Sequence, residues 1–260
     1  MNWVRVTKTN PCAVCGRPDW CTVGEFFFCC MRVQSAKPCT NGGWLHPLNE
    51  KYDKPIFNPE PPRPEVDCEK MMIGWLVETK EDHRTRFAKS LGVSHRSLFC
   101  VGAAWAPPHR AWAFAMKDGQ GRTVGIRLRS ESGRKWSVPG SHQGLFIPNL
   151  TRESTVLLVE GATDVAAGLE LGFFTIGRPS CSGGISQVTS FIKWSGIRRV
   201  IIVADNDGPG VLGAKTLQPY LPVTSAIVIL PSKDLRSFLN FGGTSTVFQS
   251  TLSQCVWQAK

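Results

Sequence analysis

The second half of the chain has the apolar pattern of an α/β domain. From residue 155 onward, short apolar runs typical of buried strands alternate with segments of helical periodicity. Strands that alternate with helices are typical of a mainly parallel sheet flanked by helices. The predicted order is strand 155–160 (TVLLVE), helix 162–172, strand 173–176, helix 186–194, strand 198–205, helix 211–220 and strand 225–230.

The preceding segment has a different pattern. Two helices are predicted over residues 69–77 and 81–91, and beyond residue 98 the sequence changes to short alternating strands around an Asp118-Gly119 turn. This pattern predicts an α+β subdomain.

The first fifty residues are rich in cysteine and lack long apolar runs, which predicts a small zinc-ribbon-like β module held by a crosslink. A proline-rich stretch follows, which favours an extended, semi-rigid linker. The predicted organisation is a zinc-binding module (1–50), a linker (51–66), a basic α+β subdomain (67–150), an α/β domain (151–240) and a C-terminal tail (241–260).

The charge of the chain indicates a polyanionic partner. Its 260 residues carry a formal net charge of +10, and the sequence pI is near 9.3. Seven basic residues and only two acidic ones lie between residues 110 and 150. Lys and Arg side chains that neutralise phosphates release condensed counterions, which favours binding to nucleic acid.

No targeting or membrane signal is evident. The sequence has no apolar run of the roughly eighteen residues that a membrane helix needs. Its first residues, MNWVRVTKTN, lack the apolar stretch of a secretory signal. We therefore expect a cytoplasmic protein without a membrane partner.

Acidic residues end two of the predicted strands. Glu160 closes one strand, and Asp205 and Asp207 follow another, before Gly208 and Gly210. In open parallel sheets the reactive site lies beyond the carboxyl ends of the strands, and carboxylates that converge there suit Mg²⁺. An Asp at a strand end is also often a helix cap or a turn residue.

Together, the segments VLLVEGATDVAAGLELG and VIIVADNDGPGVLGA resemble the TOPRIM domain of primases, topoisomerases, recombination proteins and some nucleases. The resemblance implies that Glu160, Asp205 and Asp207 are catalytic and bind Mg²⁺ or Mn²⁺. It also places Asp164 as a further metal ligand, one helical turn after Glu160.

Two flanking segments resemble primases in particular. LPSKDLRSFL matches a Lys-Asp element after the last strand, which implies that Asp234 joins the metal site and that Lys233 contacts the nucleotide or DNA. The sequence departs from this pattern at Arg236, where many primases have a second acidic residue.

The second segment, GRTVGIRLRSESGRKWSVPGSHQGLF, is similar to the stretch that precedes TOPRIM in primases. The resemblance implies that Arg127, Arg129 and Lys135 contact the template backbone or the incoming nucleotide. A solvated, charged hairpin is the alternative for each of these residues.

Six cysteines lie between residues 12 and 39 and begin with a C-x-x-C pair, a pattern typical of tetrahedral Zn²⁺. The predicted ligands are Cys12, Cys15, Cys21 and Cys30, with Cys39 or His46 as alternatives to Cys21. Cys29 and Cys30 are adjacent, so a strand directs them to opposite faces and only one is expected to bind.

The resemblance implies a DNA primase of the DnaG type, which synthesises short RNA primers on single-stranded DNA from ribonucleoside triphosphates. The two metal ions are expected on Glu160, Asp205, Asp207, Asp164 and Asp234. A replicative helicase would act in trans, and a mobile-element origin fits such a chain. The alternative is a RecR-like recombination or repair mediator that binds DNA without polymerase activity.

Overall fold

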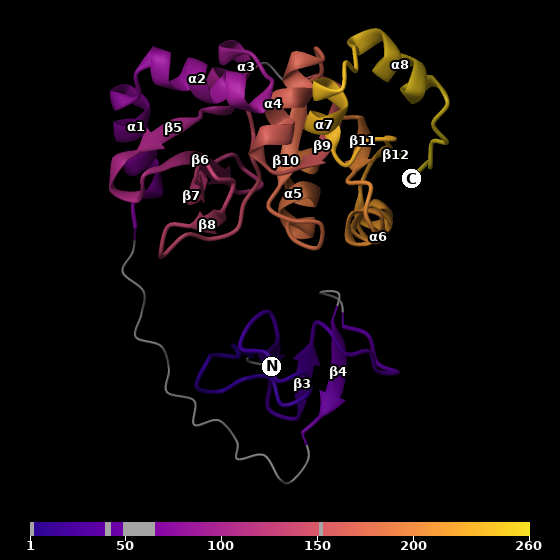
Figure 1. Cartoon of the computed structure of the whole chain (residues 1–260). Coiled ribbons are helices and arrows are strands. Elements are labelled where there is room, and N and C mark those ends of the chain that lie inside the picture. The colour runs from indigo at the N-terminus through magenta and orange to yellow at the C-terminus, as the bar shows by residue number, and fades with distance from the viewer. Residues whose placement is uncertain (1–2, 40–42, 49–65, 151–152) are drawn as a thin grey trace. The chain divides into compact units, whose positions relative to one another are not determined.

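The computed structural model describes residues 3–39, 43–48, 66–150 and 153–260, which form two compact units, Met1–Pro62 and Arg63–Lys260 (Figure 1). All of the predicted linker except Val66 lies outside the described residues.

The N-terminal unit contains a small antiparallel sheet. Its strands lie in the order β1 (Val4–Arg5), β2 (Thr22–Val23), β3 (Phe27–Cys30) and β4 (Trp44–Pro47). Among the described residues, the buried core of this sheet contains Val6, Val23 and Phe28 besides cysteines.

The second unit begins with three helices and an antiparallel sheet. The helices are α1 (Cys68–Glu78), α2 (Glu81–Leu91) and α3 (His95–Val101). The strands are β5 (Ala104–Ala106), β6 (Ala111–Lys117), β7 (Thr123–Arg129) and β8 (Lys135–Ser137), with a 3₁₀ turn over Pro107–His109. The sequence did not predict α3, which is short and polar at its start. Its ends are nevertheless well defined, because Ser94 accepts a hydrogen bond from the Ser97 N–H and Gly102 is left-handed.

A four-stranded parallel sheet follows, as the sequence pattern predicted. Its order is β10 (Thr175–Arg178), β9 (Thr155–Glu160), β11 (Arg199–Ala204) and β12 (Thr224–Ile229). The intervening helices are α4 (Ala162–Glu170), α5 (Ile185–Ser195) and α6 (Gly208–Leu217), the last extended by a 3₁₀ turn over Gln218–Tyr220.

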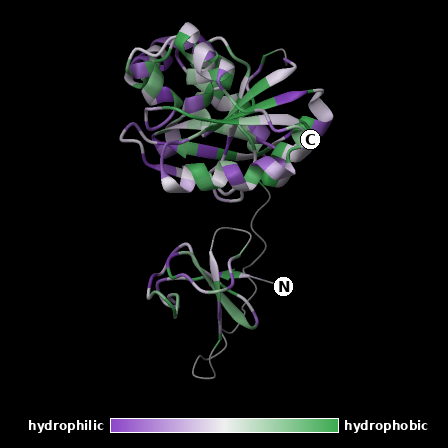
Figure 2. Ribbon diagram, turned by 90° about the vertical axis from the view of Figure 1, so that its right-hand side faces the viewer, coloured by the Kyte–Doolittle hydropathy of each residue, from purple (hydrophilic) through white to green (hydrophobic). Residues whose placement is uncertain are grey.

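Alternating side chains of the parallel strands fill two separate cores. On β9, Leu157 and Val159 join a core with α4, whereas Val156 and Leu158 join a core with α5 and α6. The helices carry both green hydrophobic and purple hydrophilic residues in Figure 2, as expected of helices with one buried side.

The C-terminal part is more ordered than the predicted tail. Helix α7 (Leu235–Asn240) is followed by α8 (Ser245–Ser253), and both pack on the core that contains α4. Beyond α8, Gln258 exchanges two backbone hydrogen bonds with Ser225 of β12. In the described part of the chain, no helix has the length and apolar character needed to cross a membrane.

Candidate active site

The order of the parallel strands has its topological switch point between β9 and β11. The chain leaves β9 for β10 on one side and then returns to β11 on the other side, so the direction of winding changes between β9 and β11. Ligands of open α/β sheets bind at this position, beyond the carboxyl ends of the strands. Glu160 ends β9, and Asp205 directly follows β11.

Asp205 is held by the start of α6. Asp207 caps this helix and accepts a hydrogen bond of 2.7 Å from the Gly210 N–H. A side chain at Gly210 would clash with Asp205, because an added Cβ would lie 2.5 Å from the Asp205 carbonyl oxygen. Gly210 therefore allows α6 to begin against Asp205.

Asp164 and Asp234 come from the starts of α4 and α7. Asp164 is only 6% exposed, and its Oδ1 accepts a hydrogen bond of 3.1 Å from the Arg236 N–H. Asp234 caps α7 by accepting a hydrogen bond of 2.7 Å from the Ser237 N–H. The Asp164–Arg236 bond thus joins the starts of the two helices.

These carboxylates share one pocket of about 200 Å³ with basic side chains. The predicted site residues that line it are Glu160, Asp164, Asp205, Asp234, Arg127, Arg129, Lys135 and Lys233. Arg236 lines it as well. Asp207 is exposed and does not line the pocket, although its charge acts on Glu160 and Asp205.

Strand alternation in the antiparallel sheet brings the basic residues to the pocket. Arg127 and Arg129 lie two residues apart on β7 and therefore share a face, and Lys135 of β8 pairs with Arg129. The intervening Leu128 lies in a separate core with α1. The segment that follows β8 bridges the two sheets, because Leu145 pairs with Lys117 and Phe146 pairs with Gly177.

The sequence did not identify Arg178, which the structure places beside Glu160. The two residues are partners in the register of β10 and β9, and Arg178 Nη2 lies 3.9 Å from Glu160 Oε1. Arg178 is only 2% exposed. The missing information was the strand register, because the local sequence GRPS reads as a turn.

Burial changes the titration of the acidic residues. It raises the pKa of Glu160, although Arg178 opposes this shift. Burial and the charges of Glu160 and Asp234 raise the pKa of Asp205 to about 7. Burial and Asp234 likewise raise the pKa of Asp164 to about 7. A bound cation would favour the ionised form of these carboxylates.

Glu160 and Asp205 fit a hard divalent cation. Glu160 Oε1 is buried and has no hydrogen-bond partner in the structure, so an oxygen ligand is available there. Carboxylate oxygens are the ligands that Mg²⁺ prefers in sites that also bind phosphate.

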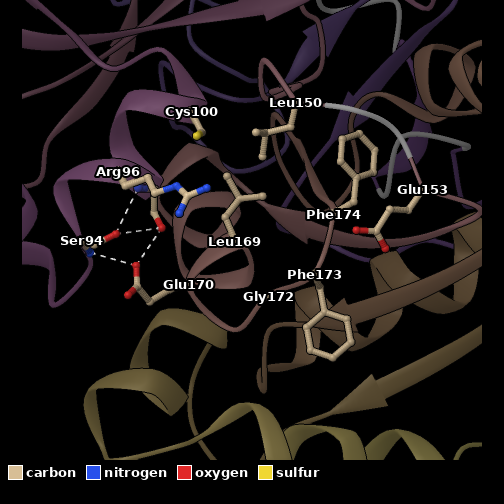
Figure 3. Close-up of a pocket in the computed structure, with 11 residues that line it drawn as sticks. Ser94, Arg96, Cys100, Leu150, Glu153, Leu169, Glu170, Gly172, Phe173 and Phe174 are labelled. Atoms are coloured by element: carbon tan, nitrogen blue, oxygen red, sulfur yellow. Dashed lines mark hydrogen bonds between the residues drawn. The ribbon is translucent and has the colours of Figure 1, made fainter.

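A second pocket, of about 390 Å³, contains none of the predicted site residues (Figure 3). Its Glu170 accepts hydrogen bonds from the Ser94 N–H (3.0 Å) and from the Ser97 hydroxyl (2.7 Å). Glu170 thus has a structural role at the start of α3. The predicted site residues line the smaller pocket instead.

In the N-terminal unit, four cysteines converge. The sulfur atoms of Cys12, Cys15, Cys21 and Cys30 all lie within 4.8 Å of one another. The Cys15–Cys21 and Cys21–Cys30 separations are 3.7 and 3.9 Å. Tetrahedral zinc with Zn–S bonds of about 2.3 Å places its sulfur ligands about 3.8 Å apart. The cluster therefore fits a zinc ion.

The remaining candidates lie apart from this cluster. Cys29 Sγ lies 2.8 Å from Cys39 Sγ, on the face of β3 opposite to Cys30, and His46 Nε2 lies 3.0 Å from the Val33 carbonyl oxygen. Burial raises the pKa of Cys21 to about 12, so a bound cation is needed to keep this cysteine ionised.

No family model and no curated protein matches the sequence. Solved structures do match. A DnaG primase catalytic domain bound to single-stranded DNA is 16% identical, with a TM-score of 0.58 over 73% of this chain and 79% of that one. The zinc-binding and RNA polymerase domains of the Aquifex aeolicus primase are 16% identical, with a TM-score of 0.59 over 74% of this chain and 60% of that one.

The primase fragment of the bacteriophage T7 primase-helicase is 17% identical, with a TM-score of 0.51 over 63% of this chain and 72% of that one. At these identities the likeness concerns the fold. The chain has the fold of primase catalytic cores.

Proposed function

We propose that this chain is a DNA primase, which makes short RNA primers on single-stranded DNA by metal-assisted nucleotidyl transfer. One observation carries the proposal. Carboxylates at the carboxyl ends of β9 and β11 and basic residues of a separate antiparallel sheet line the same pocket. Such a pocket suits a reaction that needs both a divalent cation and a phosphate-bearing substrate.

In the proposed reaction, the 3′ oxygen of one nucleotide bonds to the α-phosphorus of the next while the bond to pyrophosphate breaks. Glu160, Asp205 and Asp207 would hold Mg²⁺ or Mn²⁺, which lowers the pKa of the attacking hydroxyl when bound. Arg127, Arg129, Lys135 and Lys233 would orient the phosphates, since charged donors form strong hydrogen bonds with phosphate oxygens.

The wider assignments belong to the same proposal. Residues 151–240 would form a TOPRIM domain, and the four-cysteine module within residues 1–50 would help to select the template. A replicative helicase would be a further partner. The matched primase structures support this reading, whereas the comparisons give no support to the recombination-mediator alternative.

The decisive experiment is primer synthesis by the full chain on a pool of single-stranded DNA templates, with ribonucleotides and Mg²⁺ or Mn²⁺. Asp205→Ala combined with Asp207→Ala should abolish dinucleotide formation. Asp82→Asn is the matched control, because Asp82 is exposed on α2 and pairs with Arg86. A wild-type chain that binds DNA but forms no dinucleotide with either metal would refute the proposal.

A second pair of variants tests the basic face. Arg127→Ala should weaken binding of a ribonucleoside triphosphate by about tenfold or more, because a hydrogen bond to a charged group is lost. Arg122→Ala is the control, since Arg122 lies on the same hairpin but binds Asp118. Equal losses in both variants would indicate a general charge effect instead of a phosphate site.

A further inference from the structure

The carboxylates of the pocket have different basic neighbours. Asp164 and Asp234 act on each other and on Arg129, and Arg236 acts on both Asp164 and Arg129. We call these four residues the Asp164 group. Glu160 and Asp205 instead have Lys135 as a basic neighbour, Arg178 acts on Glu160, and the charge of Asp207 acts on both carboxylates. We call the three acidic residues the Glu160 group.

Within the Asp164 group, the chain itself supplies the positive charge. Two guanidinium groups accompany two carboxylates in the lining of the pocket, so the charges of this group balance. One oxygen of each carboxylate is already occupied, since Asp164 accepts from the Arg236 N–H and Asp234 from the Ser237 N–H. Little negative charge remains to attract a divalent cation.

Each guanidinium group has one buried nitrogen without an acceptor. Arg129 Nε and Arg236 Nε are both buried without a hydrogen-bond partner in the structure. A buried donor on a charged group is costly to leave unpaired. Both arginines line the pocket, so an anion in the pocket would satisfy them.

The Glu160 group has the opposite balance. Its three carboxylates outnumber the two basic neighbours, Lys135 and Arg178. Glu160 Oε1 is buried without a hydrogen-bond partner, although it lies 3.9 Å from Arg178 Nη2. An acidic excess with an available oxygen is what a hard cation requires.

We propose that the pocket binds a single divalent cation, at the Glu160 group, and that Arg236 with Arg129 provides the positive charge for substrate phosphates at the Asp164 group. Of the five carboxylates, the three of the Glu160 group would serve the metal ion, and the two of the Asp164 group would lie beside the arginines that bind phosphate. The phosphate part rests on the proposed function, whereas the number of metal ions does not.

Counting Mn²⁺ on the full, zinc-loaded chain tests the metal part. Electron paramagnetic resonance measures free Mn²⁺ during a titration and so gives the number of bound ions. Wild type should bind one ion, Asp205→Asn should lose it, and Asp234→Asn should retain it. Two bound ions in wild type, one of them lost in Asp234→Asn, would overturn the proposal whether or not the chain makes primers.

Arg236→Asp provides a test in the opposite direction. A carboxylate in place of the guanidinium should create a second Mn²⁺ site that disappears again when Asp234→Asn is added. Circular dichroism of each variant shows whether it is folded. If Arg236→Asp is folded and still binds only one ion, Arg236 is not what excludes the second cation and the proposal fails.

The phosphate part is measured separately, as binding of ATP without added divalent cation. Arg236→Gln should weaken ATP binding by about tenfold or more, because a charged donor is lost. Arg122→Gln should leave it unchanged. An unaltered affinity in Arg236→Gln would remove the phosphate role. A correct ion count and ATP affinity without primer synthesis would instead refute the proposed function alone.

Discussion

At the scale of single residues, Asp164 is the most enclosed acidic group of the pocket. Its side chain is buried, whereas Glu160, Asp205 and Asp234 are partly exposed. A carboxylate in such a position destabilises the fold when it ionises, because it loses hydration that its surroundings replace only in part. Ionisation of Asp164 adds a negative charge to the pocket but lowers the stability of the fold, so these two effects oppose each other.

This opposition predicts a pH-dependent effect of Asp164→Asn. An unfolded Asp titrates near 3.9, whereas burial and Asp234 raise the folded pKa of Asp164 to about 7. Between these values the folded chain keeps a proton that the unfolded chain releases, so the free energy of unfolding falls as pH rises from about 4 to 7. Without added metal, Asp164→Asn should be more stable than wild type at pH 8, by on the order of 4 kcal/mol.

At pH 5 the difference should shrink to roughly 1–2 kcal/mol, because the folded chain then keeps its proton on Asp164 and only the unfolded chain releases it. The protonated carboxyl resembles Asn, whose side-chain oxygen can also accept from the Arg236 N–H. Urea denaturation at both pH values measures the difference. A variant that is less stable than wild type at pH 8 would show that the ionised carboxylate is stabilising.

At the scale of elements, the start of α6 determines the position of Asp205. A Cβ at Gly210 would clash with Asp205, whereas a Cβ at Gly208 would meet no atom within 4 Å. Gly210→Ala should therefore displace Asp205 and weaken Mn²⁺ binding by about tenfold, as changes next to metal ligands do. Gly208→Ala should bind Mn²⁺ normally. Calorimetric titration of both variants measures this, and equal affinities would mean that α6 does not position the ligand.

Strand β3 provides a comparison between neighbouring cysteines. Cys30 belongs to the four-cysteine cluster, whereas Cys29 faces Cys39. Cys30→Ser should lose the zinc ion, and Cys29→Ser should retain it. Zinc content of the purified chains, measured by atomic emission, distinguishes the two. Retention of zinc by Cys30→Ser would exclude Cys30 as a required ligand.

Elements with strong local patterns were predictable from the sequence, and long-range relations were not. Strands β9 and β11 are apolar runs, of which the first ends at Glu160 and the second is followed directly by Asp205, so both the strands and the acidic residues at their ends were evident. Arg178 was missed because only the pairing of β10 with β9 places it beside Glu160. Helix α8 was missed because its sequence, STVFQSTLS, contains few strong helix formers and depends on packing of Phe248.

At the scale of the whole molecule, the two compact units have different sources of stability. The N-terminal unit buries few apolar side chains besides its cysteines, whereas the second unit contains three larger apolar cores. A structural zinc ion contributes about 10–16 kcal/mol in small zinc modules. We therefore expect the first unit to depend on a bound zinc ion.

Removal of zinc should accordingly unfold only the N-terminal unit. In differential scanning calorimetry, a zinc chelator should abolish one transition and leave the Tm of the Arg63–Lys260 unit unchanged. Added zinc should restore the lost transition. A chelator that lowers the Tm of the larger unit would show that the two units unfold cooperatively.

The pairing of Gln258 with Ser225 also bears on aggregation. Strand β12 lies at the edge of the parallel sheet, and an exposed edge is a template onto which another chain can add a strand. The Gln258 backbone occupies the hydrogen-bonding groups of Ser225. Next to it, the Arg199 guanidinium carbon lies over the Trp257 ring, 5.7 Å from the centre of the ring. The C-terminal segment thus covers the start of this edge strand and should hinder its pairing with a strand of another chain.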